Sequence, residues 1–227
     1  SMMQNEVKYD VLHTHDIFSQ QVGGKYESAK EIGAQVSSSK IRSHWQRIGE
    51  QMTDKDMYVQ YSSGHGYQAG LGVGVSYDQM RDNMLSYRGQ ELISFTMACH
   101  SGGLVNSFKR KQSEMDAMKA QGRVMFVMTS STVQELSSTG PGRDSGEDGP
   151  NGSAGSAFGY SLWKALIGGA DGEVDGVKDG FIDLGEVEAF TKRRTKEVGG
   201  HSPVSIGFNY HRLIMNEVPS ASYIEAI

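Results

Sequence analysis

The sequence has a single cysteine, Cys99, among its 227 residues. No disulfide can therefore form within the chain, and the compartment stays open because many secreted proteins also lack disulfides. No apolar run approaches the roughly 20 residues that a membrane-spanning helix needs, and no signal peptide is visible. These absences exclude a disulfide-built scaffold and predict a chain without a membrane span.

Positive charge is also scarce. The 22 Lys and Arg residues are outnumbered by 27 Asp and Glu residues, which gives a formal net charge of −5. Two short basic runs, Lys109–Lys111 and Lys192–Arg194, are typical of solvated helix faces. Because nucleic-acid binding depends on a basic surface, we expect no nucleic-acid partner.

Apolar runs rich in β-branched and aromatic residues alternate with segments of helical period. Strands are expected at 57–61, 92–97 and 124–128, with a weaker one at 9–12. Helices are expected from Ile41 to Met52 behind the serines at 37–39, from Tyr77 to Tyr87 behind a capping box at Ser76–Gln79, over 156–167 and over 184–197. This alternation predicts a single α/β domain over residues 1–227, with a mostly parallel central sheet and helices on both faces. The acidic, Gly-rich stretch 139–155 predicts a mobile loop.

Two polar residues follow neighbouring strands of the expected sheet. His65 comes just after the strand at 57–61, and Cys99 comes just after the strand at 92–97. One crossover helix separates these strands, so both side chains are expected in the crevice at the carboxyl edge of the sheet. An imidazole there can activate the thiol as a nucleophile and later protonate a leaving amine. The N–H groups of Gly66 and Cys99 could stabilise an oxyanion, and the flanking glycines let a peptide backbone approach closely.

Each residue also has an ordinary interpretation. A lone cysteine at a strand end is usually a small buried hydrophobe, and a histidine between glycines is usually a turn residue. Their matched positions at two strand ends favour a catalytic pair. His100 is expected to point away from Cys99, because neighbouring residues of an extended chain face opposite sides, and so to have at most a supporting role.

The same two segments resemble the catalytic blocks of the caspase-like cysteine peptidases. Tyr61–Gly66 is similar to their histidine block, and Ala98–Gly102 is similar to the nucleophile block of metacaspases and legumain. Weaker likeness is found at Leu104–Asn106, Thr129–Thr132, Ser137–Ser138, Phe158–Trp163 and His201–Val204. The resemblance implies a caspase-like three-layer α/β sandwich, a His65–Cys99 dyad and a peptide or protein substrate, with no cofactor required. It also implies that Ser137 and Ser138 line the substrate cleft.

The sequence departs from these families in two places. Met97 stands where legumain and metacaspases carry an acidic residue that helps bind the side chain before the cleaved bond, so a preference for Arg or Lys is not expected. Asp16 is the candidate for a carboxylate that takes over this role. The relatives also start with a further central strand, and residues 7–12 correspond to the strand after it. That first segment is removed, supplied by a second chain or absent, and the sequence leaves these alternatives open.

Residues 171–186 fit part of a calcium-loop template. The acidic residues at loop positions 1, 5, 9 and 12 are Asp175, Asp179, Asp183 and Glu186, and Gly180 occupies position 6. Against the template, Val177 replaces the usual Asp or Asn at position 3, and Lys178 adds a positive charge. Asp171 or a water could supply the missing ligand. The alternative is a solvated Asp-Gly turn region without calcium.

The leading hypothesis is a cysteine endopeptidase that passes through a thioester at Cys99. Two alternatives stay open. One is a catalytically silent caspase-fold module that binds partners or calcium, which the missing first strand and Met97 favour and the intact His65–Cys99 pair opposes. The other is a peptide ligase, because ligation and hydrolysis share the same thioester.

Overall fold

A computed structural model of the protein describes residues 10–11, 14–15, 36–138 and 155–218. Where the sequence predicts one domain, the contacts of the chain cluster into two compact units. The sheet unit comprises the described residues 36–136 and 204–210. The loop unit comprises the described residues 10–11, 14–15, 137–138, 155–203 and 211–218.

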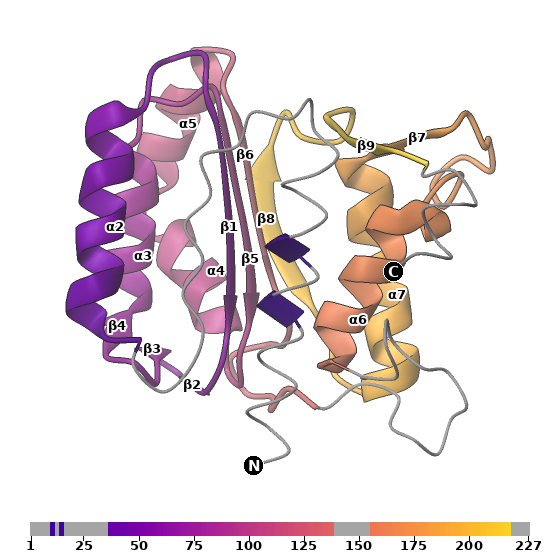
Figure 1. The fold of residues 1–227 in the computed structure, drawn as a ribbon, viewed down its shortest axis with the longest axis horizontal. Helices are drawn as coiled ribbons and strands as arrows, with labels where there is room; N and C mark the ends of the chain where they lie inside the picture. Colours follow the sequence, from indigo (N-terminus) through magenta and orange to yellow (C-terminus); the bar gives the residue numbers. More distant parts are fainter. Residues whose placement is uncertain (1–9, 12–13, 16–35, 139–154, 219–227) are drawn as a thin grey trace. The chain divides into compact units, whose positions relative to one another are not determined.

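The sheet unit is built on four strands in the order β1-β5-β6-β8 (Figure 1). They are β1 (Met57–Ser63), β5 (Glu91–Met97), β6 (Val124–Thr129) and β8 (Val204–Phe208). The first three are parallel, and β8 runs antiparallel to β6. The three apolar runs of the sequence are therefore the three parallel strands. In β5 and β6 the residues that face each side of the sheet are buried, as is typical of parallel strands.

Four helices of the same unit gather on one side of this sheet (Figure 1). They are α2 (Ser38–Gln51), α3 (Tyr77–Ser86), α4 (Gly102–Lys109) and α5 (Gln112–Ala120). Ser37 caps α2 by accepting from Lys40 N–H, and Ser76 and Gln79 form the predicted capping box of α3. Their apolar faces join the sheet in one core cluster that includes Trp45, Met80, Leu104, Met115 and Val127. The α/β fold with a mostly parallel central sheet flanked by helices is thus confirmed.

A small antiparallel sheet connects β1 to α3. It consists of β2 (Gly66–Tyr67), β3 (Gly70–Leu71) and β4 (Val75–Ser76). The sequence did not predict it, because strands of two residues carry no alternating pattern. This sheet matters for the site, since its first strand starts directly after His65.

The loop unit contains two helices and a strand pair. The helix α6 (Ala157–Lys164) continues into the π-helical turn η2 (Ala165–Gly169), and α7 spans Leu184–Gly199. The strand β7 (Phe181–Asp183) pairs antiparallel with β9 (Ile214–Glu217). The two helices expected at 156–167 and 184–197 are therefore confirmed.

The strand expected at 9–12 is wrong where the structure describes it. Asp10 and Val11 are helical, and Thr14 Oγ1 donates to Asp10 O at 2.8 Å across one helical turn. The Asp10 carboxylate is buried and accepts from Ser156 N–H at 2.9 Å, at the start of α6. Asp10 therefore serves as a hydrogen-bond partner of that helix start and does not belong to a strand. The loop expected to be mobile lies, over residues 139–154, outside the described residues.

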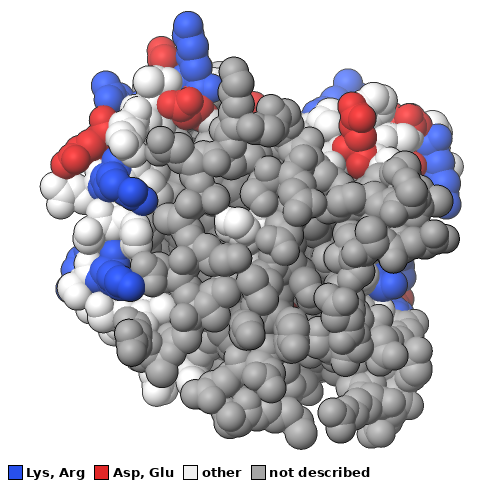
Figure 2. Space-filling model, viewed as in Figure 1, with Lys and Arg blue, Asp and Glu red and all other residues white. Residues whose placement is uncertain are grey.

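Within the described ranges, no helix is both long enough and apolar enough to cross a membrane. On the face drawn in Figure 2, acidic and basic side chains lie next to one another. Among the described residues several charges are paired, such as Arg110 with Asp78 and Arg193 with Glu197. Charges of both signs are thus interspersed on the described part of that face.

Candidate active site

His65 and Cys99 lie just beyond the carboxyl ends of two adjacent parallel strands. In the β1–β5 register Ser63 stands opposite Met97, so each residue comes two positions after the end of its strand. Gly64 N–H donates to Met97 O at 3.0 Å and extends the pairing by one further bond. The predicted placement at one edge of the sheet is confirmed, whereas the catalytic role of the two residues stays a prediction.

The turn after His65 packs directly on the nucleophile turn. A side-chain carbon added at Gly66 would collide with the Cys99 carbonyl oxygen and would lie 2.7 Å from Ala98 Cβ. Only glycine permits this approach. From the sequence, the flanking glycines were expected to let a substrate backbone approach. At Gly66 the space is instead taken by the protein's own chain, which holds the His65 and Cys99 segments together.

Both proposed catalytic side chains remain accessible. His65 is exposed and Cys99 is partly buried. Gly72 N–H donates to His65 O at 2.8 Å, and Gly66 pairs with Leu71 in the β2–β3 ladder. Since alternate pairs of an antiparallel ladder exchange hydrogen bonds, Gly66 belongs to a pair that exchanges none, and its N–H is directed away from β3. That orientation suits the role of oxyanion donor that the sequence analysis gave it.

Tyr77, the first residue of α3, also belongs to this site. A carbon added at Gly103, in the first turn of α4, would lie 2.8 Å from the Tyr77 ring and would collide with Gln68 O. The Tyr77 hydroxyl is buried, and it has no hydrogen-bond partner among the described residues. Burial, and to a lesser degree the neighbouring Cys99, raises the pKa of Tyr77 far above its ordinary value, so the hydroxyl stays protonated. The sequence indicates only a core position on a helix stripe for Tyr77, and no sequence signal distinguishes a core residue from a residue of the site.

His100 supports the turn that carries Cys99 by bonding to residues 133 and 135. Its backbone has a positive φ of 58°, its N–H donates to Glu135 O at 2.9 Å, and its ring Nδ1 lies 2.9 Å from Val133 O. Because a carbonyl oxygen only accepts, Nδ1 carries the proton of this bond. From the sequence, an extended chain was expected at Cys99–His100. The chain forms a turn there instead, and His100 ties that turn to residues 133–135.

The residues expected to form the substrate pocket do not gather in one unit. Met97, at the end of β5, is 8% exposed and lies on the sheet face opposite Leu92 and the core cluster. Ser137 and Ser138 belong to the loop unit, where Ser138 Oγ donates to Gly199 O at 2.8 Å. Asp16 lies outside the described residues. The pocket therefore stays a prediction from the resemblance.

The carboxylates of the acidic loop bond to the loop's own backbone. Asp175 accepts from Val177 N–H and Asp179 accepts from Phe181 N–H, both at 2.9 Å. Asp171, the expected substitute ligand, accepts from Asp179 and Gly180 N–H groups. These are side-chain turns of the kind that Asp forms without any metal.

Asp183 and Glu186 form a capping box at the start of α7. Glu186 accepts from Asp183 N–H at 3.1 Å and from Gly172 N–H at 2.7 Å. Burial, and then the nearby carboxylates of Asp183 and Asp171, raise the pKa of Glu186. In the described part of the chain no three acidic, histidine or cysteine residues gather to hold a metal ion. As arranged, these side chains do not fit a calcium site, and calcium binding stays a prediction.

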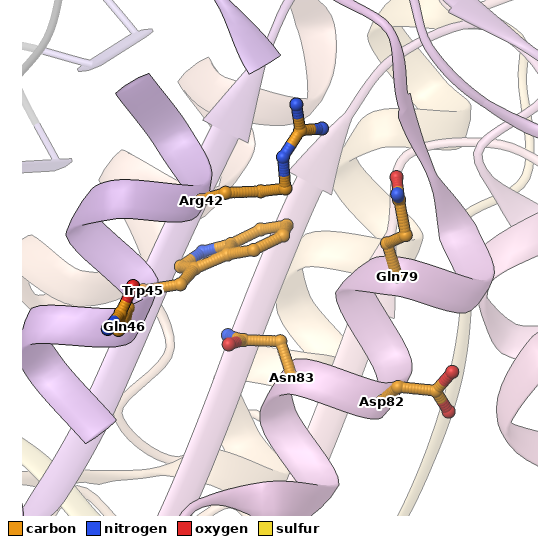
Figure 3. A pocket seen from close by; sticks show the side chains of 6 residues that line it. All are labelled: Arg42, Trp45, Gln46, Gln79, Asp82 and Asn83. Atoms are coloured by element: carbon orange, nitrogen blue, oxygen red, sulfur yellow. The ribbon is translucent and has the colours of Figure 1, made fainter. Parts of the chain in front are cut away.

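A groove of about 300 Å³ lies elsewhere in the sheet unit, between α2 and α3 (Figure 3). The residues lining it are Arg42, Trp45, Gln46, Gln79, Asp82 and Asn83. None of them is a proposed site residue. Five of its six lining residues are polar or charged, and it adds nothing to the chemistry at Cys99.

No family model matches the chain, and no curated protein matches it. Solved structures do match its fold. One of them, the crystal structure of protein GSU0716 from Geobacter sulfurreducens, is 10% identical to the chain with a TM-score of 0.53, and the match covers 90% of this chain and 83% of that one. At this identity the likeness shows the fold alone. The chemistry of the site therefore rests on the residues described above.

Proposed function

We propose that the chain is a cysteine endopeptidase of the caspase-like type, with Cys99 as nucleophile and His65 as its proton-transfer partner. One observation carries the proposal. The turn after His65 packs on the Cys99 carbonyl at the carboxyl edge of two adjacent parallel strands, with Gly66 at the contact. A thiol and an imidazole carried on two segments that pack on one another support a proposal of nucleophilic acyl transfer.

The reaction proceeds in two halves. The Cys99 thiolate adds to the carbonyl carbon of the scissile bond, and the protonated His65 ring donates its proton to the nitrogen of the leaving amine as the C–N bond breaks. This leaves a thioester on Cys99 and a neutral His65. Water then gives a proton to His65 and adds to the thioester carbon, and the C–S bond breaks to release the acid and restore the thiolate–imidazolium pair.

Two backbone donors stabilise the negative oxygen that forms in each half. The N–H of Gly66 is directed away from the β2–β3 ladder, and the N–H of Cys99 belongs to the nucleophile itself. An oxyanion donor of this kind contributes about 10²- to 10³-fold to the rate. The protonated Tyr77 hydroxyl, buried beside Cys99, keeps the surroundings of the thiolate free of a further negative charge.

Cleavage of a protein substrate, with identification of the cleavage products, tests the proposal directly. A denatured protein is incubated with the wild type and with Cys99→Ala, and the new termini are identified by mass spectrometry. We expect cleavage by the wild type alone. Newly joined peptides in place of free carboxyl ends would show that the activity is ligation and not hydrolysis. Intact substrate in both samples would favour the silent binding module.

A further inference from the structure

Three buried serines surround the peptide bond that precedes Cys99. Ser101 lies in the same turn as the nucleophile, and Ser130 and Ser131 follow β6, the strand next to β5. All three residues are 0% exposed. Buried hydroxyls need hydrogen-bond partners, and these three find them around Ala98 and one another.

The hydrogen bonds converge on the two polar atoms of Ala98. Its carbonyl oxygen accepts from Ser130 Oγ at 3.1 Å and from Ser131 Oγ at 3.2 Å, and its N–H donates to Ser130 Oγ at 3.1 Å. Ser101 Oγ lies 3.2 Å from Ser130 Oγ and 3.3 Å from Ser131 Oγ, and it accepts from Ser131 N–H at 3.3 Å. A consistent proton assignment exists, in which Ser130 and Ser131 donate to Ala98 and Ser101 donates to one of them. The Ala98 carbonyl also accepts from Ser101 N–H at 3.3 Å within the same turn, so three donors meet on this oxygen.

This network fixes a backbone direction at the nucleophile. The Ala98 carbonyl and the Cys99 N–H belong to one planar peptide group, and in a trans peptide they point in opposite directions. No cis peptide bond occurs among the described residues. The donors on the oxygen, two of them buried serine hydroxyls, therefore direct the Cys99 N–H away from the Ala98 carbonyl. A flip of the plane would break these bonds and leave buried hydroxyls without an acceptor, which is unfavourable.

The packing around the network leaves little room for rearrangement. A carbon added at Gly102, the first residue of α4, would lie 2.7 Å from Val133 N and 2.9 Å from Ser131 O. The segment that carries the serines is thus pressed against the start of α4. Close packing thus holds the start of α4 against the same segment that bonds to the peptide before Cys99.

We propose that Ser101, Ser130 and Ser131 are positioning residues that hold the Cys99 N–H in the direction of the reaction oxyanion. The inference rests on the proposed peptidase function and deepens it. The serines act through the Ala98–Cys99 peptide and not on the thiol. If the three serines only stabilised the fold, their removal would have no effect specific to acyl transfer.

Two reactions of Cys99 separate these roles. Iodoacetamide alkylates the thiolate by displacement of iodide, and no oxyanion forms. A peptide aldehyde adds to the same sulfur to give a hemithioacetal, whose oxygen takes the place of the reaction oxyanion. The first reaction reports the thiol alone, and the second reports the thiol together with the N–H direction.

The test uses the double variant Ser130→Ala/Ser131→Ala and a panel of acetylated tripeptide aldehydes that differ in the final residue. We expect aldehyde affinity and kcat to fall by about 10- to 100-fold, short of the ~10²–10³ for complete loss of a donor, while KM and the alkylation rate change by less than about 2-fold. The matched control is Ser161→Ala, which removes a buried hydroxyl that donates to Ala157 O at 2.7 Å. It is expected to change neither reaction.

Equal losses in alkylation and aldehyde affinity would overturn the inference, because the serines would then hold only the fold. Unchanged aldehyde affinity in the double variant would overturn it as well. If the double variant fails to fold, the ratio of aldehyde affinity to alkylation rate is measured in Ser131→Ala, where the same direction of change is expected. A wild-type protein that alkylates but binds no aldehyde of the panel would contradict the peptidase function itself, and with it the inference. That outcome is recognised without any variant.

Discussion

The two polar sites of the chain use hydrogen bonds in opposite ways. Around Cys99, backbone groups and buried serines bond to one another, and the exposed His65 and the partly buried Cys99 remain accessible to a substrate. In the acidic loop the carboxylates themselves accept from backbone N–H groups, two of them on Glu186. In the first site, serines next to the proposed catalytic pair help to fix the backbone, whereas in the second the carboxylates that would bind a ligand fix it themselves.

This difference separates a candidate for chemistry from a candidate for structure. A reactive group must be held in place while its own atoms stay available to the substrate. A carboxylate that already accepts from the backbone must give up those bonds before it can bind a cation. The residue types alone suggested a site in both places, and the allocation of hydrogen bonds distinguishes them.

The largest expected effect tests the accessible site. His65→Ala should lower kcat/KM for a peptide substrate by about 10²- to 10⁴-fold, because the variant lacks the group that moves the proton. The control is His44→Ala on α2, whose ring contacts Arg47 and which should leave the rate unchanged. Steady-state kinetics on both variants decide the matter. A rate for His65→Ala close to that of the control would remove histidine from the mechanism.

The next effect concerns the side chain before the cleaved bond. Met97 offers no charge to a bound Arg or Lys, so burial of an unpaired guanidinium costs several kcal/mol, and these residues should be disfavoured by at least about 10-fold. A peptide library varied at that position measures the preference, and Met97→Asp should raise cleavage after Arg or Lys. A wild-type profile led by Arg would contradict the Met97 argument and direct attention to Asp16.

A smaller effect tests the contact that joins the two catalytic segments. Gly66→Ala should destabilise the protein by about 1–3 kcal/mol and reduce activity, because the methyl group meets the Cys99 carbonyl and a backbone atom cannot move aside easily. In the control Gly49→Ala the added carbon lies 3.0 Å from the Tyr87 ring, a side chain that can shift. Urea denaturation compares the two. Equal stability of both variants would show that the close contact is unimportant.

The acidic loop should give the smallest effect. Since its carboxylates already accept hydrogen bonds from the backbone, we expect a dissociation constant for calcium above about 10⁻⁵ M, which is the weak-affinity end of the sensor range. Titration calorimetry of wild type and Glu186→Gln measures this. Submicromolar binding that Glu186→Gln abolishes would show that the loop rearranges into a true calcium site, and the contrast between the two sites would fail.

The raised pKa of Glu186 adds a pH dependence to the same loop. The folded protein takes up a proton at a pH where the unfolded chain, with a carboxyl near its ordinary 4.5, does not. The contribution of Glu186 to stability should therefore rise as the pH falls through the folded pKa and be complete below the unfolded one. Urea midpoints at several pH values, for wild type relative to Glu186→Gln, check the sign. A relative midpoint that falls as the pH is lowered would contradict it.

Much of the sheet unit is predictable from the sequence. The strands β5 and β6 are largely apolar because both of their faces are buried, and the partly buried β1 is also mostly apolar before Ser62. The start of α3 is visible in the capping box at Ser76–Gln79. The expected strand at 9–12 fails because Asp10 bonds to Ser156, 146 positions away, and no local pattern reveals such a partner.

The site is predictable only in part. The places of His65 and Cys99 follow from strand ends and from the direction of a parallel sheet. The roles of Ser101, Ser130 and Ser131 do not follow, because short polar residues after a strand are typical of any loop. That these serines close on Ala98 is visible only once β5 and β6 are aligned.

The most direct test of the central claim is covalent labelling of the accessible site. A panel of peptide acyloxymethyl ketones that vary in the final residue is applied to wild type, Cys99→Ala and His65→Ala, and the intact masses are measured. The account predicts one label on wild type at Cys99, none on Cys99→Ala, and slow labelling of His65→Ala, with all three proteins folded. Proteolysis retained by purified Cys99→Ala, or a wild-type thiol that reacts with iodoacetamide and with no ketone of the panel, would contradict it.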